Sequence, residues 1–320
     1  MKEWTIQGND ADQRLDRFLS KALQNASKGF IQKSIRKKKV KINGQKTEAN
    51  YRLQEGDVMR LYLSDEFFET KEKSDTRPYP TKDPGEDLAI LHEDEGLLAV
   101  NKRRNQLTHG AADGVVERAI DYLIQTRAYQ PEKELSFTPA SCNRLDQNTT
   151  GIVLIAKNHE SLKRINEKIK RRETEKIYTA LVKGRVDKEI RAEGYIQKNT
   201  QENLSVVSRE YREGAKSVAT LFRPIEHFAG YTLLEVQLIT GRSHQIRSQL
   251  KELGFPVVGD RKYGDPALNA KVKSILGFTD QFLHSGRFVI KGYYGPEKDL
   301  AIEAPLPEEW GKITAQFKKE

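Results

Sequence analysis

Two apolar patterns with helical spacing occur near the start of the chain. One apolar helix face is predicted from the spacing of Leu15, Phe18, Leu19, Ala22 and Leu23. A second, shorter helix is predicted over residues 30–35. A strand over residues 40–42 leads into Asn43-Gly44, a pair typical of tight hairpin turns, and another strand is predicted over residues 58–63. Residues 1–63 are therefore expected to form a small module of two helices and a few short strands.

From residue 88 onward the pattern changes to short apolar runs bounded by turns. Such runs predict strands over residues 97–100, 151–156 and 177–182. A half-buried strand is predicted from the alternating apolar positions Leu234, Val236 and Leu238. A helix is indicated by the shared face of Leu162, Ile165 and Ile169. Because helices and strands do not alternate regularly, we expect an α+β fold with a largely antiparallel mixed sheet flanked by helices.

The segment between these patterns has the composition of a linker. It reads SDEFFETKEKSDTRPYPTKDPGE, with few aliphatic residues and with prolines at Pro78, Pro80 and Pro84. We therefore predict a small module at residues 1–63, a linker at 64–86 and a larger domain at 87–320.

Composition narrows the possible partners and compartments. The 320 residues carry a formal net charge of +9, which favours polyanionic partners. The single cysteine, Cys142, excludes an intramolecular disulfide and argues against a cysteine-built metal site. No run approaches the roughly 20 apolar residues of a membrane span, and the N-terminus lacks the apolar core of a signal peptide. We expect a cytoplasmic monomer that engages neither membrane nor metal.

Positive charge is concentrated within the small module. Between residues 28 and 41 there is no acidic residue, while the basic residues are Lys28, Lys33, Arg36, Lys37, Lys38, Lys39 and Lys41. A charge run of this kind is often only a solvated helix face. Here the absence of interspersed acids, at the point where a helix leads into a strand, favours RNA binding.

Several motifs of cofactor and metal chemistry are absent from the sequence. There is no G-x-G spacing for a dinucleotide, no phosphate-binding G-x-x-x-x-G-K-[ST] loop and no H-E-x-x-H. The six histidines are scattered. An enzyme built from this chain is therefore expected to use side chains alone, with no cofactor and no metal.

One acidic residue, Asp146, lies in the polar stretch NRLDQNTTG and is followed directly by the apolar run IVLIAK. Taken alone, it is an ordinary turn residue before a strand. Three further stretches change this interpretation: VNKRRNQLTHG from residue 100, KIYTALV from 176, and TGRSHQIR from 240, which is followed by GFPVVGDRKYG.

Together these motifs resemble those of the RluA family of RNA pseudouridine synthases, and the similarity extends over residues 88–310. Leu283-His284-Ser285 and Ala304-Pro-Leu-Pro307 resemble the closing segment of the family. The small module resembles the S4 RNA-binding domain through RLDRFLSKAL, VKINGQ and LQEGDVMRLYL. An S4 domain preceding this catalytic domain is a familiar arrangement in the family.

The resemblance implies a set of site residues. The catalytic residues would be Asp146, Tyr178 and Arg247. The substrate-binding residues would be Arg144, Asn143, Lys102, Arg242, His244 and Gln245. Three positions depart from the family pattern: Asn143 replaces a histidine, Thr150 a serine and Arg103 a proline. Asn143 and Arg103 put the substrate preference in doubt, although the catalytic Asp146 is retained.

The resemblance also implies the reaction, which is the isomerisation of uridine to pseudouridine in structured RNA without a cofactor. Large-subunit ribosomal RNA is the expected substrate, with transfer RNA an open alternative and the target uridine undetermined. Two rival functions stay open: an inactive RNA-binding relative serving ribosome assembly, and a phosphate-transferring hydrolase with Asp146 as nucleophile. The hydrolase would ordinarily need a metal and a second acid, and NRLDQN contains none.

Overall fold

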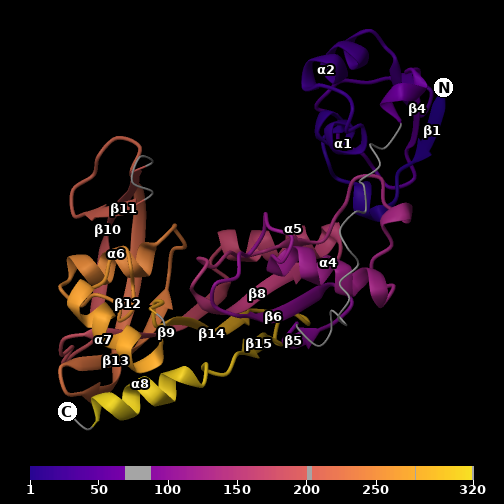
Figure 1. The fold of residues 1–320 in the computed structure, drawn as a ribbon. Helices are drawn as coiled ribbons and strands as arrows, with labels where there is room; N and C mark the ends of the chain where they lie inside the picture. The colour runs from indigo at the N-terminus through magenta and orange to yellow at the C-terminus, as the bar shows by residue number, and fades with distance from the viewer. Residues whose placement is uncertain (69–87, 200–203, 278, 319–320) are drawn as a thin grey trace.

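The computed structural model describes residues 1–68, 88–199, 204–277 and 279–318. In these residues the chain forms two sheets, a small one near the N-terminus and a large one that runs through the rest (Figure 1). The predicted linker at 64–86 lies largely outside the described residues.

The small sheet has four strands in the order β1-β4-β2-β3, all antiparallel. Its strands are β1 (Lys2–Thr5), β2 (Val40–Ile42), β3 (Gln45–Lys46) and β4 (Val58–Leu61). Two helices pack with it, α1 (Leu15–Ala22) and α2 (Lys28–Arg36). Both predicted helices and the predicted hairpin are confirmed, and the hairpin turn has positive φ at Asn43 (50°) and Gly44 (77°). Strand β1 was not predicted, and β4 ends two residues earlier than expected.

The core of the small module reaches beyond its predicted boundary. A single-turn 3-10 helix, η2 (Asp65–Phe67), lies within the predicted linker, and the ring of Phe67 stacks on Phe30 at 4.1 Å. Leu135, from the larger domain, packs against the same core. Hydrophobic burial therefore extends the module past residue 63.

A polar junction joins the small module to the larger domain. The buried Asp10 carboxylate accepts hydrogen bonds from the Ser136 amide (3.1 Å) and hydroxyl (2.7 Å). Gln13 donates to the same hydroxyl, and Lys163 pairs with Asp12. Burial raises the pKa of Asp10, and the bonds from Ser136 oppose that rise. The two parts are thus in direct contact through specific hydrogen bonds.

The large sheet has eleven strands and is antiparallel at every pair except β8–β14. Its main path runs β11-β10-β12-β13-β9-β14-β8-β6-β5, with β15 beside β14 and β7 beside β8. The strand bounds are β5 (Ile90–Glu93), β6 (Leu97–Lys102), β7 (Ala140–Ser141), β8 (Thr150–Ala156), β9 (Thr174–Lys183), β10 (Ile190–Asn199), β11 (Leu204–Ser208), β12 (Lys216–Phe228), β13 (Tyr231–Leu238), β14 (Leu283–Ile290) and β15 (Leu300–Glu303). Each strand predicted from the sequence is present, so the predicted fold class is confirmed.

Helices cover both faces of the large sheet. One face carries α4 (Val115–Gln125) and α6 (Gln245–Glu252). The other face carries α5 (His159–Lys170), α7 (Pro266–Leu276) and α8 (Glu309–Phe317). In β8, Val153 and Ile155 enter the first layer while Ile152 and Leu154 enter the second. Burial on both faces explains why this strand is apolar throughout rather than alternating.

Strands β8 and β14 approach each other closely at Gly151. Gly151 has φ 110°, and a Cβ there would lie 2.3 Å from the carbonyl oxygen of Ser285. Only glycine combines this backbone conformation with so little space. The pairing of β8, the strand that follows Asp146, with β14 therefore requires a residue without a side chain at position 151.

We expect Gly151→Ala to lower the free energy of unfolding by several kcal/mol, because backbone strain of about 1–3 kcal/mol adds to the overlap with Ser285. Gly44→Ala is the matched control, since Gly44 also has positive φ (77°) but nothing within 4 Å of the added Cβ. That control should cost only about 1 kcal/mol. Denaturant unfolding measures both, and equal losses would contradict the role given to the close approach.

Candidate active site

The segment carrying Asp146 is attached to β8 by the side chain of Asn143. The Asn143 amide donates to the Ile152 carbonyl (2.9 Å) and accepts from the Leu154 N–H (2.8 Å). Both hydrogen-bonding groups of Asn143 are thus used on the strand backbone. The Thr149 N–H then closes a turn on the Asp146 carbonyl. Asn143 was predicted to bind substrate, and in the structure its side chain bonds to the backbone of β8.

Arg247 lies opposite Asp146, in the first turn of α6. Its Nη1 donates to Asp146 Oδ2 at 2.6 Å, so two of the three predicted catalytic residues are in direct contact. The Arg247 side chain is 6% exposed and that of Asp146 28%. The carboxylate is therefore bound on one oxygen by a buried cation and remains reachable from solvent.

A second acid, Asp260, completes this arrangement. Its carboxylate accepts from Arg247 Nε at 2.6 Å and Nη2 at 2.9 Å, a bidentate pair with both groups buried. Burial acts to lower the pKa of Arg247, but the bonds to Asp260 and Asp146 outweigh it and raise that pKa. Burial acts to raise the pKa of Asp260, and the Arg247 bond lowers it overall. Arg247 consequently stays positively charged.

Asp260 was not predicted as a site residue, although it lies in the stretch GFPVVGDRKYG that follows the TGRSHQIR motif. Two amides, from Lys262 and Tyr263, also donate to its Oδ1. A buried Asp directly after a glycine-bounded apolar run is the signal that could have found it. Nothing in the sequence says that its partner is Arg247, thirteen residues earlier.

Lys102 is buried and joins two loops. Its Nζ donates to the carbonyl oxygens of Arg103 (3.0 Å), Gln106 (2.8 Å) and Gln147 (2.7 Å), the last directly following Asp146. Three acceptors match the three protons of an ammonium group. Burial lowers the pKa of Lys102 to about 7, and the charge of Asp146 opposes that shift. Lys102 therefore attaches the Asp146 turn to the loop after β6.

Tyr178 lies in β9 and faces the same layer as α6, with its side chain in the main core. Burial raises the pKa of its hydroxyl to about 12, the charge of Asp146 adds to this rise, and the nearby Ser285 side chain opposes it. The phenol is thus protonated at neutral pH and close enough to Asp146 to sense its charge.

The remaining predicted site residues differ in their surroundings. Gln245 is buried, accepts from the Thr240 hydroxyl and the Arg242 amide, and donates to β12, so it shapes the motif turn. Arg144 and Arg242 have exposed side chains that form no ion pair with any described residue. His244 lies beside Asp146, with 3.9 Å between Nε2 and Oδ1. Of the predicted set, Asp146, Arg247 and His244 come together directly.

Comparisons with known proteins agree with this geometry. A family profile described as RNA pseudouridylate synthase matches residues 96–252, and an S4 domain profile matches residues 13–59. The chain is 31% identical to the uncharacterized RNA pseudouridine synthase YlyB of Bacillus subtilis (strain 168), covering 98% of this chain and 97% of that one. It is 32% identical to ribosomal large subunit pseudouridine synthase C of Vibrio cholerae, covering 92% and 90%. The chain belongs to the RNA pseudouridine synthase family.

A solved structure shows the same fold. The human protein titled RNA pseudouridylate synthase domain containing 4 aligns with a TM-score of 0.59 and 20% identity, over 72% of this chain and 93% of that one. The family profiles and the curated relatives confirm the predicted enzyme class and the predicted S4 domain of this pseudouridine synthase.

The basic residues of its S4 domain lie on and directly after α2. The side chains of Lys33, Arg36, Lys37, Lys38 and Lys39 are exposed and pair with no acid in the described part of the chain. In Figure 1, α1 lies between α2 and the catalytic domain, so α2 is the outer of the two helices.

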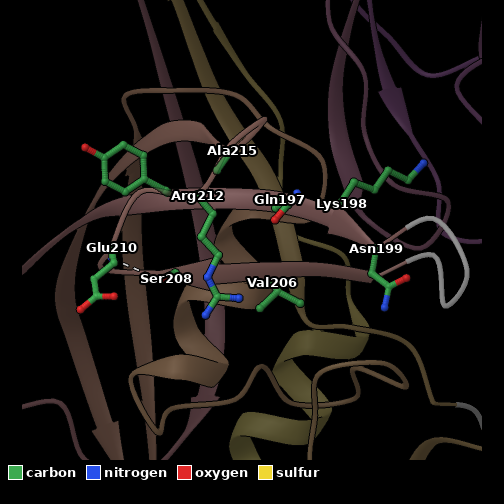
Figure 2. A pocket seen from close by; sticks show the side chains of 9 residues that line it. Gln197, Lys198, Asn199, Val206, Ser208, Glu210, Arg212 and Ala215 are labelled. Atoms are coloured by element: carbon green, nitrogen blue, oxygen red, sulfur yellow. Dashed lines mark hydrogen bonds between the residues drawn. The ribbon is translucent and has the colours of Figure 1, made fainter.

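A shallow groove lies on the hairpin of β10 and β11 and the chain that follows it, and its lining does not include Asp146. Figure 2 shows its lining, which includes Gln197, Lys198, Asn199 and Arg212.

Among residues whose placement is described, no three His, Cys, Asp or Glu side chains are grouped to hold a metal. Nor does any described helix combine the length and apolarity that a membrane span requires.

We expect Lys102→Met to reduce both stability and turnover of the pseudouridine synthase. The substitution removes the Lys102 donor from three partly buried carbonyls, at up to about 1–3 kcal/mol each, offset in part because a buried cation is removed. The turn carrying Asp146 also loses its attachment. Thermal melting and single-turnover rates measure the two effects. Lys183→Met, which removes a half-exposed lysine paired with Asp265, should change neither, and Lys102→Met behaving like this control would contradict the assignment.

Proposed function

We propose that this enzyme converts specific uridines of large-subunit ribosomal RNA to pseudouridine, with Asp146 as the essential catalytic carboxylate. The observation that carries the proposal is the geometry at Asp146: one oxygen accepts from Arg247 at 2.6 Å, while the carboxylate stays partly exposed. A carboxylate paired with a cation stays ionised and can act as a nucleophile or a base.

The isomerisation breaks the bond between C1′ and N1 of uridine, turns the base and joins C1′ to C5. No electron or chemical group is gained or lost, so side chains are sufficient. Tyr178 has the position and the protonation state to pack on the uracil and to move a proton near Asp146. Because the faces of a stacked uridine are covered, the nucleotide must leave the helix first. Arg144, exposed two residues before Asp146, is suited to occupy the vacated space or to contact a phosphate.

Ribosomal RNA is favoured as the substrate by the relatives. Several of those that match over most of the chain are named ribosomal large subunit pseudouridine synthase C, from Vibrio cholerae and Escherichia coli among others. The exposed basic surface of the S4 domain is suited to a structured RNA backbone. A ribosomal substrate also supports the cytoplasmic location expected from the sequence.

We expect Asp146→Asn to abolish turnover while the protein stays folded and still binds RNA. The amide keeps the shape but removes the charge on which the chemistry depends, and loss of one catalytic proton-transfer group costs at least about 10²–10⁴-fold. The assay incubates wild-type and variant enzyme with large-subunit ribosomal RNA and with transfer RNA, and then digests each RNA to quantify pseudouridine. Substantial product from Asp146→Asn would overturn the catalytic role. Pseudouridine formed only in transfer RNA would overturn the assignment of ribosomal RNA as the substrate.

We expect the triple change of Lys37, Lys38 and Lys39 to Gln to weaken RNA binding and flatten its salt dependence. Each phosphate that is no longer neutralised should reduce the slope of log K against log salt by roughly 0.7–0.9, since fewer counterions are released. The same change at Lys188, Lys273 and Lys312, which are exposed lysines of the catalytic domain, is the charge-matched control. Equal slopes for the two triples would mean that the basic run only solvates the module.

A further inference from the structure

His244 lies between the catalytic carboxylate and a buried tyrosine. It precedes α6 with a left-handed backbone (φ 55°, ψ 17°), an uncommon conformation for a residue other than glycine. Its Nε2 is 3.9 Å from Asp146 Oδ1, the oxygen that Arg247 leaves free, and its Nδ1 is 2.9 Å from the Tyr263 hydroxyl. A strained residue in contact with a catalytic group indicates that the position of its side chain matters.

Tyr263 connects this histidine to the strand β11. Its hydroxyl accepts a hydrogen bond of 2.6 Å from the Ser205 N–H, and its ring lies 5.0 Å from the Arg247 guanidinium. The Ser205 hydroxyl donates to the Ser243 carbonyl, directly before His244. Strand β11 is thus bonded to both sides of the histidine, and the tyrosine contacts both groups that face Asp146.

The hydrogen bonds of the Tyr263 hydroxyl favour one imidazole tautomer of His244. A tyrosine hydroxyl has one proton to donate. Because that oxygen already accepts from Ser205, its proton is available for Nδ1 of His244, which then acts as the acceptor. With Nδ1 as the acceptor, the imidazole proton would lie on Nε2, the ring nitrogen nearer Asp146. Burial lowers the pKa of His244, which agrees with a neutral ring.

We propose that Ser205 and Tyr263 hold His244 as the Nε2–H tautomer, and that this N–H orients the free oxygen of Asp146 for the reaction. His244 is then a positioning residue, and β11 is a structural part of the active site. The distance of 3.9 Å exceeds a hydrogen bond, as is common for catalytic contacts before substrate is bound. The inference rests on the proposed catalytic role of Asp146.

Two substitutions of His244 separate a positioning role from a backbone role. Glutamine places an amide nitrogen near the Nε2 position and can still reach Asp146. Asparagine places one near Nδ1 and cannot, yet it accepts the left-handed backbone better. We expect His244→Gln to keep most of the single-turnover rate at saturating RNA. His244→Asn should lose about 10- to 100-fold with RNA affinity unchanged. Higher activity in the asparagine variant would overturn the proposal.

A third substitution tests the tautomer directly. Tyr263→Phe keeps the ring beside Arg247 and removes only the hydroxyl. The ¹⁵N chemical shifts of His244 are assigned by their absence in His244→Gln. In the wild-type enzyme they should report a single Nε2–H tautomer, and in Tyr263→Phe a mixture of the two tautomers. The single-turnover rate of Tyr263→Phe should also fall. Tyr211→Phe is the matched control, because its side chain is 62% exposed and its hydroxyl has no hydrogen-bond partner among the described residues. Shifts that stay the same in Tyr263→Phe would exclude this role of Tyr263.

The activities of Asp146→Asn and His244→Asn together distinguish a failure of this inference from a failure of the proposed function. If Asp146→Asn keeps its activity, the catalytic assignment itself is wrong. If Asp146→Asn is inactive while His244→Asn turns over at the wild-type rate, the catalytic assignment stands and only the positioning role fails.

Discussion

The bidentate pair between Arg247 and Asp260 is the interaction on which the site depends. A guanidinium this deeply buried would be strongly destabilising without a partner, and removing one member of such a pair commonly costs several kcal/mol. Asp260 uses both oxygens on Nε and Nη2, so the remaining Nη1 is directed at Asp146. The planar fork of arginine makes this division possible, whereas lysine offers a single charged point.

Around that pair, buried polar residues connect loops that the chain brings together from distant positions. Lys102 attaches the Asp146 turn to the loop after β6, Asn143 attaches the same segment to β8, and Gln245 closes the turn before α6. Each of these polar side chains finds partners within the protein, as burial requires. The result is a carboxylate whose surroundings are rigid while one of its oxygens is unoccupied by strong donors.

The S4 domain contributes at another level. It carries an exposed basic surface, and its contact with the catalytic domain is a set of hydrogen bonds around Asp10 and Ser136 rather than a large shared core. Charge on that surface adds affinity that depends on salt and carries little information about the target base. In the proposed mechanism, selection of the uridine therefore rests with the catalytic domain.

The hydrophobic pattern by itself predicted both helices, the hairpin and β4 of the small module and, in the catalytic domain, β6, β8, β9, β13 and α5, because apolar periodicity is a local property of the chain. The other elements were not predicted. Ordered motifs indicated Asp146, Tyr178 and Arg247 as site residues, and the structure brings Asp146 and Arg247 into contact. Lys102, Asn143 and Gln245 were predicted to bind the substrate, but their donors and acceptors are used within the protein. Asp260, the junction at Asp10 and the chain from Ser205 through Tyr263 to His244 were decided by tertiary structure alone. Each joins segments far apart in sequence, and which buried polar group finds which partner depends on how the packed sheet brings those segments together.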